Sequence, residues 1–310
     1  MLHTCSAPCR VLALAGSNVH DFFLIACCVS MWLQVANPAG CDGLAVTVRS
    51  EADLNKYMND AKFKAATEVG AVTIAWSKIT AIQLEKLLDG KTKIDGGLVI
   101  ENAPELTAIN LPTIETITGE LEFLTLPKVE KVVVDSLVTV SSLLKIQRLG
   151  SATEIDLSSL ETVAQSFMIY DCMKLTTLDL SSLSKAGTRT DFANLGLKEL
   201  TLPSLVTVIT LSMTNVNQAT TVSLPALKTA SYLGINGGRA LVRLSAPVLE
   251  SVSIFQLRHV SKLTSLCEVA VKASGIKRSI SFYDAMKLVQ GDAEVMKKAK
   301  VCLVPKPASV

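Results

Sequence analysis

The 310-residue chain has very little histidine, since His3, His20 and His259 are the only three. Two of them lie close to the N-terminus, ahead of a short apolar run, so a single histidine remains for most of the chain. This excludes a multi-histidine metal site, and a catalytic triad or dyad would have to use His259. No nucleophile context surrounds His259, which is predicted to be a solvated turn residue. No catalytic residue, metal or other cofactor is therefore expected.

Aromatic residues are also scarce, at 5% of the chain, although 49% of it is hydrophobic. Leu, Val, Ile and Ala must fill the interior, which suits thin and regular layers better than a core built around large rings. The formal net charge is only +2, from 30 basic and 28 acidic residues. This balance gives no sign of a nucleic-acid or anionic-membrane partner.

Near the N-terminus, residues 22–36 form an uncharged and mostly apolar run with the sequence FFLIACCVSMWLQVA. This run is too short for a membrane-spanning helix, and the small residues Ala36, Ala39 and Gly40 accompany its end. Residues 1–40 are predicted to be a signal peptide, so the mature protein is expected to be secreted or displayed at the cell surface. A membrane contact is expected only if the leader stays uncleaved or Cys41 is lipidated.

Half of the eight cysteines lie in this leader, and Cys41, Cys172, Cys267 and Cys302 remain. An even number of cysteines in a secreted chain permits disulfides without fixing their pairing. A disulfide between Cys267 and Cys302 would clamp a C-terminal cap. Cys172 is predicted to be a free, buried thiol, and Cys41 is left without a partner.

The dominant feature of the sequence is an internal repeat of the form L-x-x-[IL]-x-L-[PS]-x-L-x-x-V. A second apolar pair with a spacing of two follows most segments, as in Leu121/Phe123, and this spacing is strand periodicity. The weak member of that series is Thr190/Phe192, which predicts a bulge after Ala186. Successive segments start 22 or 23 residues apart, at Leu106, Val129, Ala152, Leu175, Leu197, Ala219, Leu241 and Leu263.

Each repeat is expected to form one coil with two or three short strands and no helix. Residues 94–274 are therefore predicted to be a mainly-β solenoid of about eight leucine-rich coils. No coil buries its apolar face alone, so aligned aliphatic residues must stack between neighbours. This interior ladder is predicted to contain Leu111, Val134, Leu157, Leu180, Leu202, Leu224 and Ala246.

The two ends of such a solenoid need covers, because a strand at an open end has unpaired backbone groups. Residues 41–93 are predicted to be an α/β cap with one helix from Ser50 to about Ala66, a strand at Val72–Trp76, and a second helix that opens at Thr80. Residues 275–310 are predicted to be a C-terminal cap helix and tail.

The outer face of the coils has two carboxylates, Asp156 and Asp179, at equivalent positions in adjacent coils. Strand spacing would place them about 5 Å apart. Such a pair is suited to glycoside hydrolysis or weak cation binding, although a solvated polar ladder is the simpler interpretation. Threonines recur on this face because of their high β-propensity, with ice binding as the functional alternative. The candidate binding face consists of Thr153, Asp156, Thr176, Thr177, Asp179, Glu199, Thr221 and Arg243.

Over residues 41–270, the order of features resembles the receptor L-domain class of leucine-rich solenoids. The resemblance begins with Cys41 and the stretch from Val46 to Leu54, a first strand followed by a helix. It continues with Ile94-Asp-Gly-Gly-Leu-Val-Ile100 and with the stretch from Leu106 to Gly119. Secreted fungal cell-wall and sporulation proteins built from such repeats are the most similar in the sequence pattern of their repeats. The resemblance implies a right-handed solenoid that acts in wall organisation or in ligand binding outside the cell.

The leading functional hypothesis is thus a non-enzymatic binding or structural repeat protein that meets a protein or glycan ligand at the cell surface or wall. One alternative is a glycan-active or cation-binding surface protein that uses the acidic residues of the outer sheet face. Another is a receptor-like ectodomain fragment that binds a protein ligand.

Overall fold

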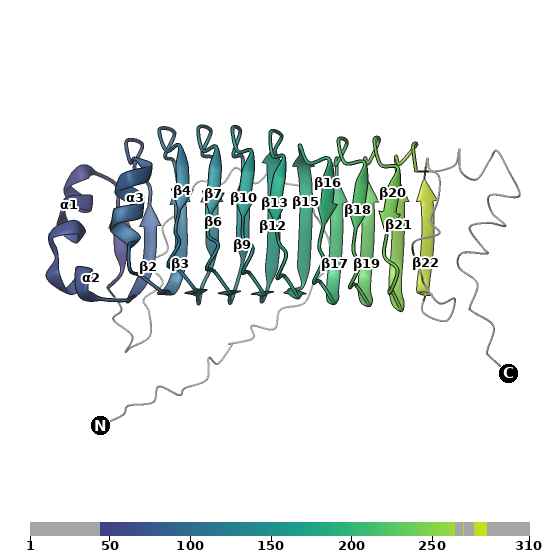
Figure 1. Ribbon diagram of the computed structural model, residues 1–310, viewed down its shortest axis with the longest axis horizontal. Helices are drawn as coiled ribbons and strands as arrows, with labels where there is room; N and C mark the ends of the chain where they lie inside the picture. Colours follow the sequence, from purple (N-terminus) through teal and green to yellow (C-terminus); the bar gives the residue numbers. More distant parts are fainter. Residues whose placement is uncertain (1–43, 264–268, 270–275, 284–310) are drawn as a thin grey trace, which may run out of the picture. The chain divides into compact units, whose positions relative to one another are not determined.

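The computed structural model describes residues 44–263, 269 and 276–283. In this part the chain is mainly β, with parallel strands that follow one another side by side and helices gathered next to the first strands (Figure 1). The predicted signal peptide, the cap helix expected after Tyr283 and the Cys267–Cys302 pair lie outside the described residues.

Helices α1 (Glu51–Asn59) and α2 (Ala61–Ala65) occupy the span for which the sequence predicted one helix. The side chain of Ser50 caps α1 by accepting the N–H of Asp53. Asp60 then interrupts the helix: its backbone is extended, and its carboxylate accepts the N–H groups of Lys62 and Phe63 at 2.8 and 3.0 Å. The single-helix prediction is wrong because an Asp that caps a second helix competes with continuation of the first.

Helix α3 (Ala81–Leu88) begins where predicted, at Thr80. The Thr80 hydroxyl accepts the Gln83 N–H, and the Gln83 side chain accepts the Thr80 N–H, which completes a capping box. Gly90, at φ +69°, turns the chain out of the helix. The strands beside these helices are β1 (Val46–Val48) and β2 (Glu68–Ile74), the latter about four residues earlier than predicted.

Between two long strands, the longest sheet is divided into two side-by-side rows of shorter strands. We call these rows the first and the second lane, and in each coil a short bend joins the strand of one lane to the strand of the other. The long strand β3 (Lys93–Glu101) pairs with both β5 and β6, and the long strand β17 (Thr207–Thr214) pairs with both β14 and β15. The first lane contains β5 (Thr116–Ile117), β8 (Thr139–Val140), β11 (Thr162–Val163) and β14 (Lys185–Ala186), and the second contains β6 (Leu121–Leu124), β9 (Leu144–Gln147), β12 (Ser166–Cys172) and β15 (Arg189–Leu195).

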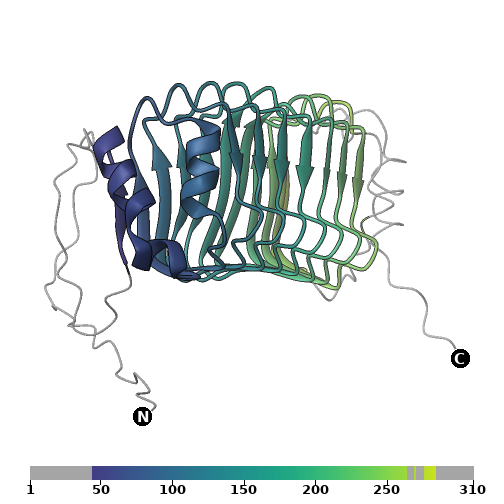
Figure 2. The same cartoon turned by 60° about the vertical axis from the view of Figure 1, so that its left-hand side comes forward.

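After β17 the sheet continues as undivided strands of eight residues. These are β19 (Thr229–Asn236), β21 (Ser251–Arg258) and β22 (Ile276–Tyr283). The strand β22 extends the sheet into the region that the sequence assigned to the C-terminal cap. Figure 2 shows this succession of parallel strands, with the helices beside its first members.

Two smaller parallel sheets contain the strands of the L-x-x-[IL]-x-L segments. One consists of β4 (Ala108–Asn110), β7 (Lys131–Val133), β10 (Glu154–Asp156) and β13 (Thr177–Asp179), and the other of β16 (Glu199–Thr201), β18 (Thr221–Ser223) and β20 (Arg243–Ser245). Partner residues in the first of these sheets are 23 positions apart, as in Glu154 and Thr177, and in the second 22 apart, as in Glu199 and Thr221. The architecture is therefore solenoid-like.

The spacing between partner residues changes around β15. It is 23 positions at Cys172 and Leu195, 22 at Ala186 and Val208, and 21 at Thr190 and Leu211. Three residues separate Ala186 from Thr190, but two separate Val208 from Leu211, so one residue is lost in the bend between the two lanes. The bulge predicted after Ala186 takes the form of this one-residue difference between neighbouring coils. With one residue fewer in the bend, the two lanes merge into continuous strands.

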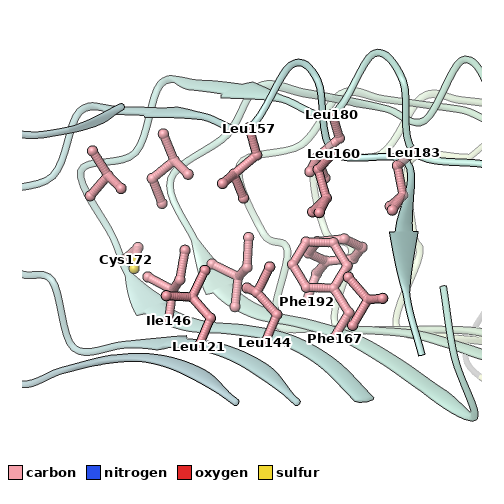
Figure 3. Close-up of a cluster of buried hydrophobic side chains, with 14 of the residues drawn as sticks. Leu121, Leu144, Ile146, Leu157, Leu160, Phe167, Cys172, Leu180, Leu183 and Phe192 are labelled. Atoms are coloured by element: carbon pink, nitrogen blue, oxygen red, sulfur yellow. The ribbon is translucent and has the colours of Figure 1, made fainter. Parts of the chain in front are cut away.

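The interior consists of stacked aliphatic side chains, as the repeat predicted. Every member of the predicted ladder, from Leu111 to Ala246, is at most 1% exposed. Larger rings fill part of the adjacent column, where Phe167 and Phe192 meet edge to face with centroids 5.5 Å apart. Figure 3 shows this packing, with the free thiol of Cys172 buried among the aliphatic side chains. The prediction for Cys172 is confirmed, and burial raises the pKa of its thiol to about 11.

Candidate functional site

The predicted binding face is divided between the two smaller sheets. Asp156 and Asp179 are direct partners in the pairing of β10 with β13, so the structure brings these carboxylates together. Each already accepts a backbone hydrogen bond: Asp156 from the N–H of Ser158 at 3.0 Å, and Asp179 from the N–H of Ser181 at 2.9 Å. These are turn-forming contacts that position the corner after each strand.

The remaining predicted residues of this face serve mostly in contacts between coils. The hydroxyls of Thr153 and Thr176 donate to main-chain carbonyls 23 residues earlier, at 3.2 and 3.0 Å. Thr177 aligns with Glu154, which forms a 2.9 Å ion pair with Lys131. In the other small sheet Glu199, Thr221 and Arg243 form one row across three strands. The structure thus places the predicted residues on two separate sheets.

A different surface has the form of a binding groove. It lies where β11 and β14 of the first lane meet the undivided strands β17, β19 and β21, and its volume is about 600 Å³. Small interior residues such as Ala186 and Ala230 lie beneath it. The outward-facing lining residues are Thr162, Ala164, Lys185, Gly187, Thr188, Thr207, Ile209, Thr229, Ser231, Ser251 and Ser253.

Several hydroxyls of this groove are not used by the protein itself. Among the described residues, the side chains of Thr162, Thr207, Thr229 and Ser231 make no hydrogen bond to the protein, whereas Thr188 donates to the carbonyl of Gln165 at 3.1 Å. On the predicted face the hydroxyls of Thr153 and Thr176 have main-chain partners, and those of Thr177 and Thr221 have none in the described part of the chain. The groove is the better candidate because its unengaged hydroxyls line a concavity.

The edge of the groove contains the strongest departure from the repeat. A Cβ atom at Gly187 would lie 1.9 Å from the carbonyl oxygen of Gln165, so only glycine fits this close approach. Three residues further on, Thr190 is fully buried, and its Oγ1 has no hydrogen-bond partner in the described part of the chain. Irregularities of this kind are common next to functional sites.

Asp191 follows directly, on the outer face of β15, and is only 5% exposed. Its carboxylate accepts hydrogen bonds from the Tyr170 hydroxyl at 3.0 Å and from Nε of Arg189. Burial, together with the Asp191 carboxylate, raises the pKa of Tyr170 to about 12, and the same carboxylate raises the pKa of Arg189. Only Nε of Arg189 is used in this way: its two Nη groups make no hydrogen bond in the described part of the chain, and the side chain is 60% exposed.

Across the described ranges, no cluster of three or more His, Cys, Asp and Glu side chains is arranged to hold a metal ion. Nor is any described helix long and apolar enough to cross a membrane. No protein-family model, curated protein or solved structure matches the chain.

Sequence reasoning missed the groove because it followed the L-x-x-[IL]-x-L segments, whose polar residues look like an exposed array. Two signals pointed to the groove nevertheless. The start positions of the repeats change from 23 to 22 residues apart near it, and the Thr190/Phe192 pair is the one polar substitution in the second apolar series.

Proposed function

We propose that the protein is a non-enzymatic binding or structural repeat protein that acts outside the cell, at the surface or wall, as a right-handed β-solenoid of eight coils of the receptor L-domain type. The regular 22- and 23-residue register supports the solenoid, and the apolar run at residues 22–36 supports export. The observation that carries the binding role is the open groove across β11, β14, β17 and β19, in which β11, β17 and β19 present unengaged hydroxyls.

The groove suits an extended ligand that lies across the strands. Lys185, Thr207, Thr229 and Ser251 are partners in neighbouring strands and form one row across the groove, so β17, β19 and β21 present a hydroxyl at the same position. Apart from Ile209, which is 52% exposed, and Lys185, the described outward lining is small or hydroxylated. Such a lining favours a polar polymer over a compact apolar ligand.

The binding role is tested by filling the groove. We expect Thr207→Tyr to lower retention of the purified protein on the insoluble surface fraction of the producing cells by about tenfold, because the ring occupies the space of the ligand. Thr221→Tyr is the matched control, since Thr221 is also an outward-facing strand threonine but lies on β18, outside the groove. Equal retention of wild type and Thr207→Tyr, with loss in Thr221→Tyr, would instead assign binding to the smaller sheet.

Export is tested separately by N-terminal sequencing of the protein recovered from its producing cells. A mature terminus near Cys41, in material from the medium or surface, is the expected result. An intact Met1 on protein confined to the cell interior would overturn the proposed location.

The alternative of a glycan-active or cation-binding protein depends on the neighbouring Asp156 and Asp179. The hydrogen bonds from Ser158 and Ser181 explain both carboxylates without catalysis. Hydrolysis of a panel of wall polysaccharides by the wild type, lost in Asp179→Asn, would favour that alternative.

A further inference from the structure

We infer that the groove binds an acidic polysaccharide, with Arg189 and Lys185 as the residues that recognise its carboxylate or sulfate groups. This inference takes from the proposed function only that the groove is the binding site. It adds the chemical class of the ligand, which the unengaged hydroxyls alone do not decide.

The charge of the lining gives the first argument. Lys185 is the one charged residue among the described residues that line the groove, and it is exposed without an ion-pair partner in that part of the chain. Arg189 follows Thr188 at the edge of the groove, in the bend between the lanes. No described carboxylate lines the groove, so an anion placed there meets cationic and hydroxyl donors.

The environment of Arg189 gives the second argument. Asp191 is 5% exposed and holds Nε of Arg189, while the Tyr170 hydroxyl, 3.0 Å away, covers the same carboxylate oxygen. Arg189 is thereby held through Nε, and its two Nη groups, on a side chain that is 60% exposed, make no hydrogen bond in the described part of the chain. Free Nη groups of a guanidinium pair well with a carboxylate or sulfate. Asp191 and Tyr170 are positioning residues here, since neither lines the groove.

The backbone of the groove argues against a peptide ligand. The strands under the groove are paired on both sides in the parallel sheet, so no free strand edge is available for an added strand. Ile209 is the single exposed large apolar side chain in the lining, and a peptide would find no apolar pocket for its own side chains. A nucleic acid would find no aromatic ring for base stacking among the residues that line the groove.

The test is calorimetric titration of the full chain with oligogalacturonate and with its methyl ester of the same length, which keeps the sugar hydroxyls but removes the charges. We expect the ester to bind about tenfold more weakly, and Arg189→Gln or Lys185→Gln to lower affinity for the acid by a similar factor. Affinity for the ester should change little in both variants. Raising the salt concentration should weaken binding of the acid only.

Arg239→Gln is the matched control, because it removes the same charge from an exposed residue outside the groove and should leave both affinities unchanged. Equal binding of acid and ester, equal losses in Arg189→Gln and Arg239→Gln, or no binding of either probe would each overturn the inference. A protein that is exported and depends on Thr207 for retention, but binds both probes equally, would contradict the acidic ligand and leave the proposed function intact.

Discussion

Thr190 is a polar residue in an interior column that is otherwise apolar. Its partners in the neighbouring coils are Phe167 and Leu211, and the column continues on both sides with Leu144 and Leu233. Removing a hydroxyl from water without giving it a hydrogen bond costs about 1–3 kcal/mol. The chain tolerates this cost next to its groove, which is where a repeat protein can depart from its own consensus for the sake of binding.

We expect Thr190→Val to stabilise the protein by about 1–2 kcal/mol, because valine has nearly the same shape and no unsatisfied group. Urea unfolding followed by circular dichroism measures the change. Thr207→Val, at an exposed position of β17, should shift the unfolding free energy by less than about 0.5 kcal/mol. Destabilisation by Thr190→Val would mean that its hydroxyl has a partner, for example a buried water.

Single residues explain why the sequence predicted some features and not others. The Thr80–Gln83 capping box and the stacked Leu157 and Leu180 depend on contacts close in sequence or on the repeat itself, so the pattern revealed them. The contact of Asp191 with Tyr170, 21 residues earlier, depends on how two coils lie against each other. Nothing in the local sequence indicates which polar outer residues are engaged and which are free.

At the scale of elements, the bend between the two lanes decides the shape of the sheet. With three residues in the bend, each coil has two separate strands, such as β11 and β12; with two residues it has one undivided strand, such as β19. The sequence showed that the repeat becomes shorter. It did not show that the bend is one of the places where a residue is lost, since any corner of the coil accommodates a deletion equally well on paper.

Gly187→Ala tests the close approach in this bend. A Cβ at this position would meet the backbone carbonyl of Gln165, which lies in the neighbouring coil and cannot rotate away as a side chain does. We expect a loss of about 1–3 kcal/mol in unfolding free energy, measured by chemical denaturation. Gly150→Ala is the matched control, because its Cβ would come no nearer than 3.9 Å to the carbonyl oxygen of Pro127. Equal stability of the two variants would contradict the close approach.

At the scale of the whole molecule, stability is the sum of contacts between neighbouring coils. Leu202 is one member of the interior ladder, fully buried between Leu180 and Leu224. Each coil depends on the coil before and the coil after it, so damage to one layer weakens the layers on both sides.

We expect Leu202→Ala to cost about 2–5 kcal/mol, because it leaves a cavity that the flanking coils cannot fill. Val206→Ala, four residues later but 36% exposed, should cost much less. Leu180→Asp should prevent folding, since it places an unpaired charge within the ladder. Native-like thermal melting of Leu202→Ala or Leu180→Asp would argue against a stacked interior at this level of the structure.

The parallel register across the groove has a consequence for valency. Neighbouring strands lie about 4.8 Å apart, so Thr207 and Thr229 present the same hydroxyl group, at that spacing, to successive units of a linear polymer. Short oligomers that contact only one or two strands should dissociate rapidly. Each added unit should lengthen the residence time until every strand of the groove is in contact with the polymer. The repeat would then act as a molecular ruler that selects polymers by length as well as by charge.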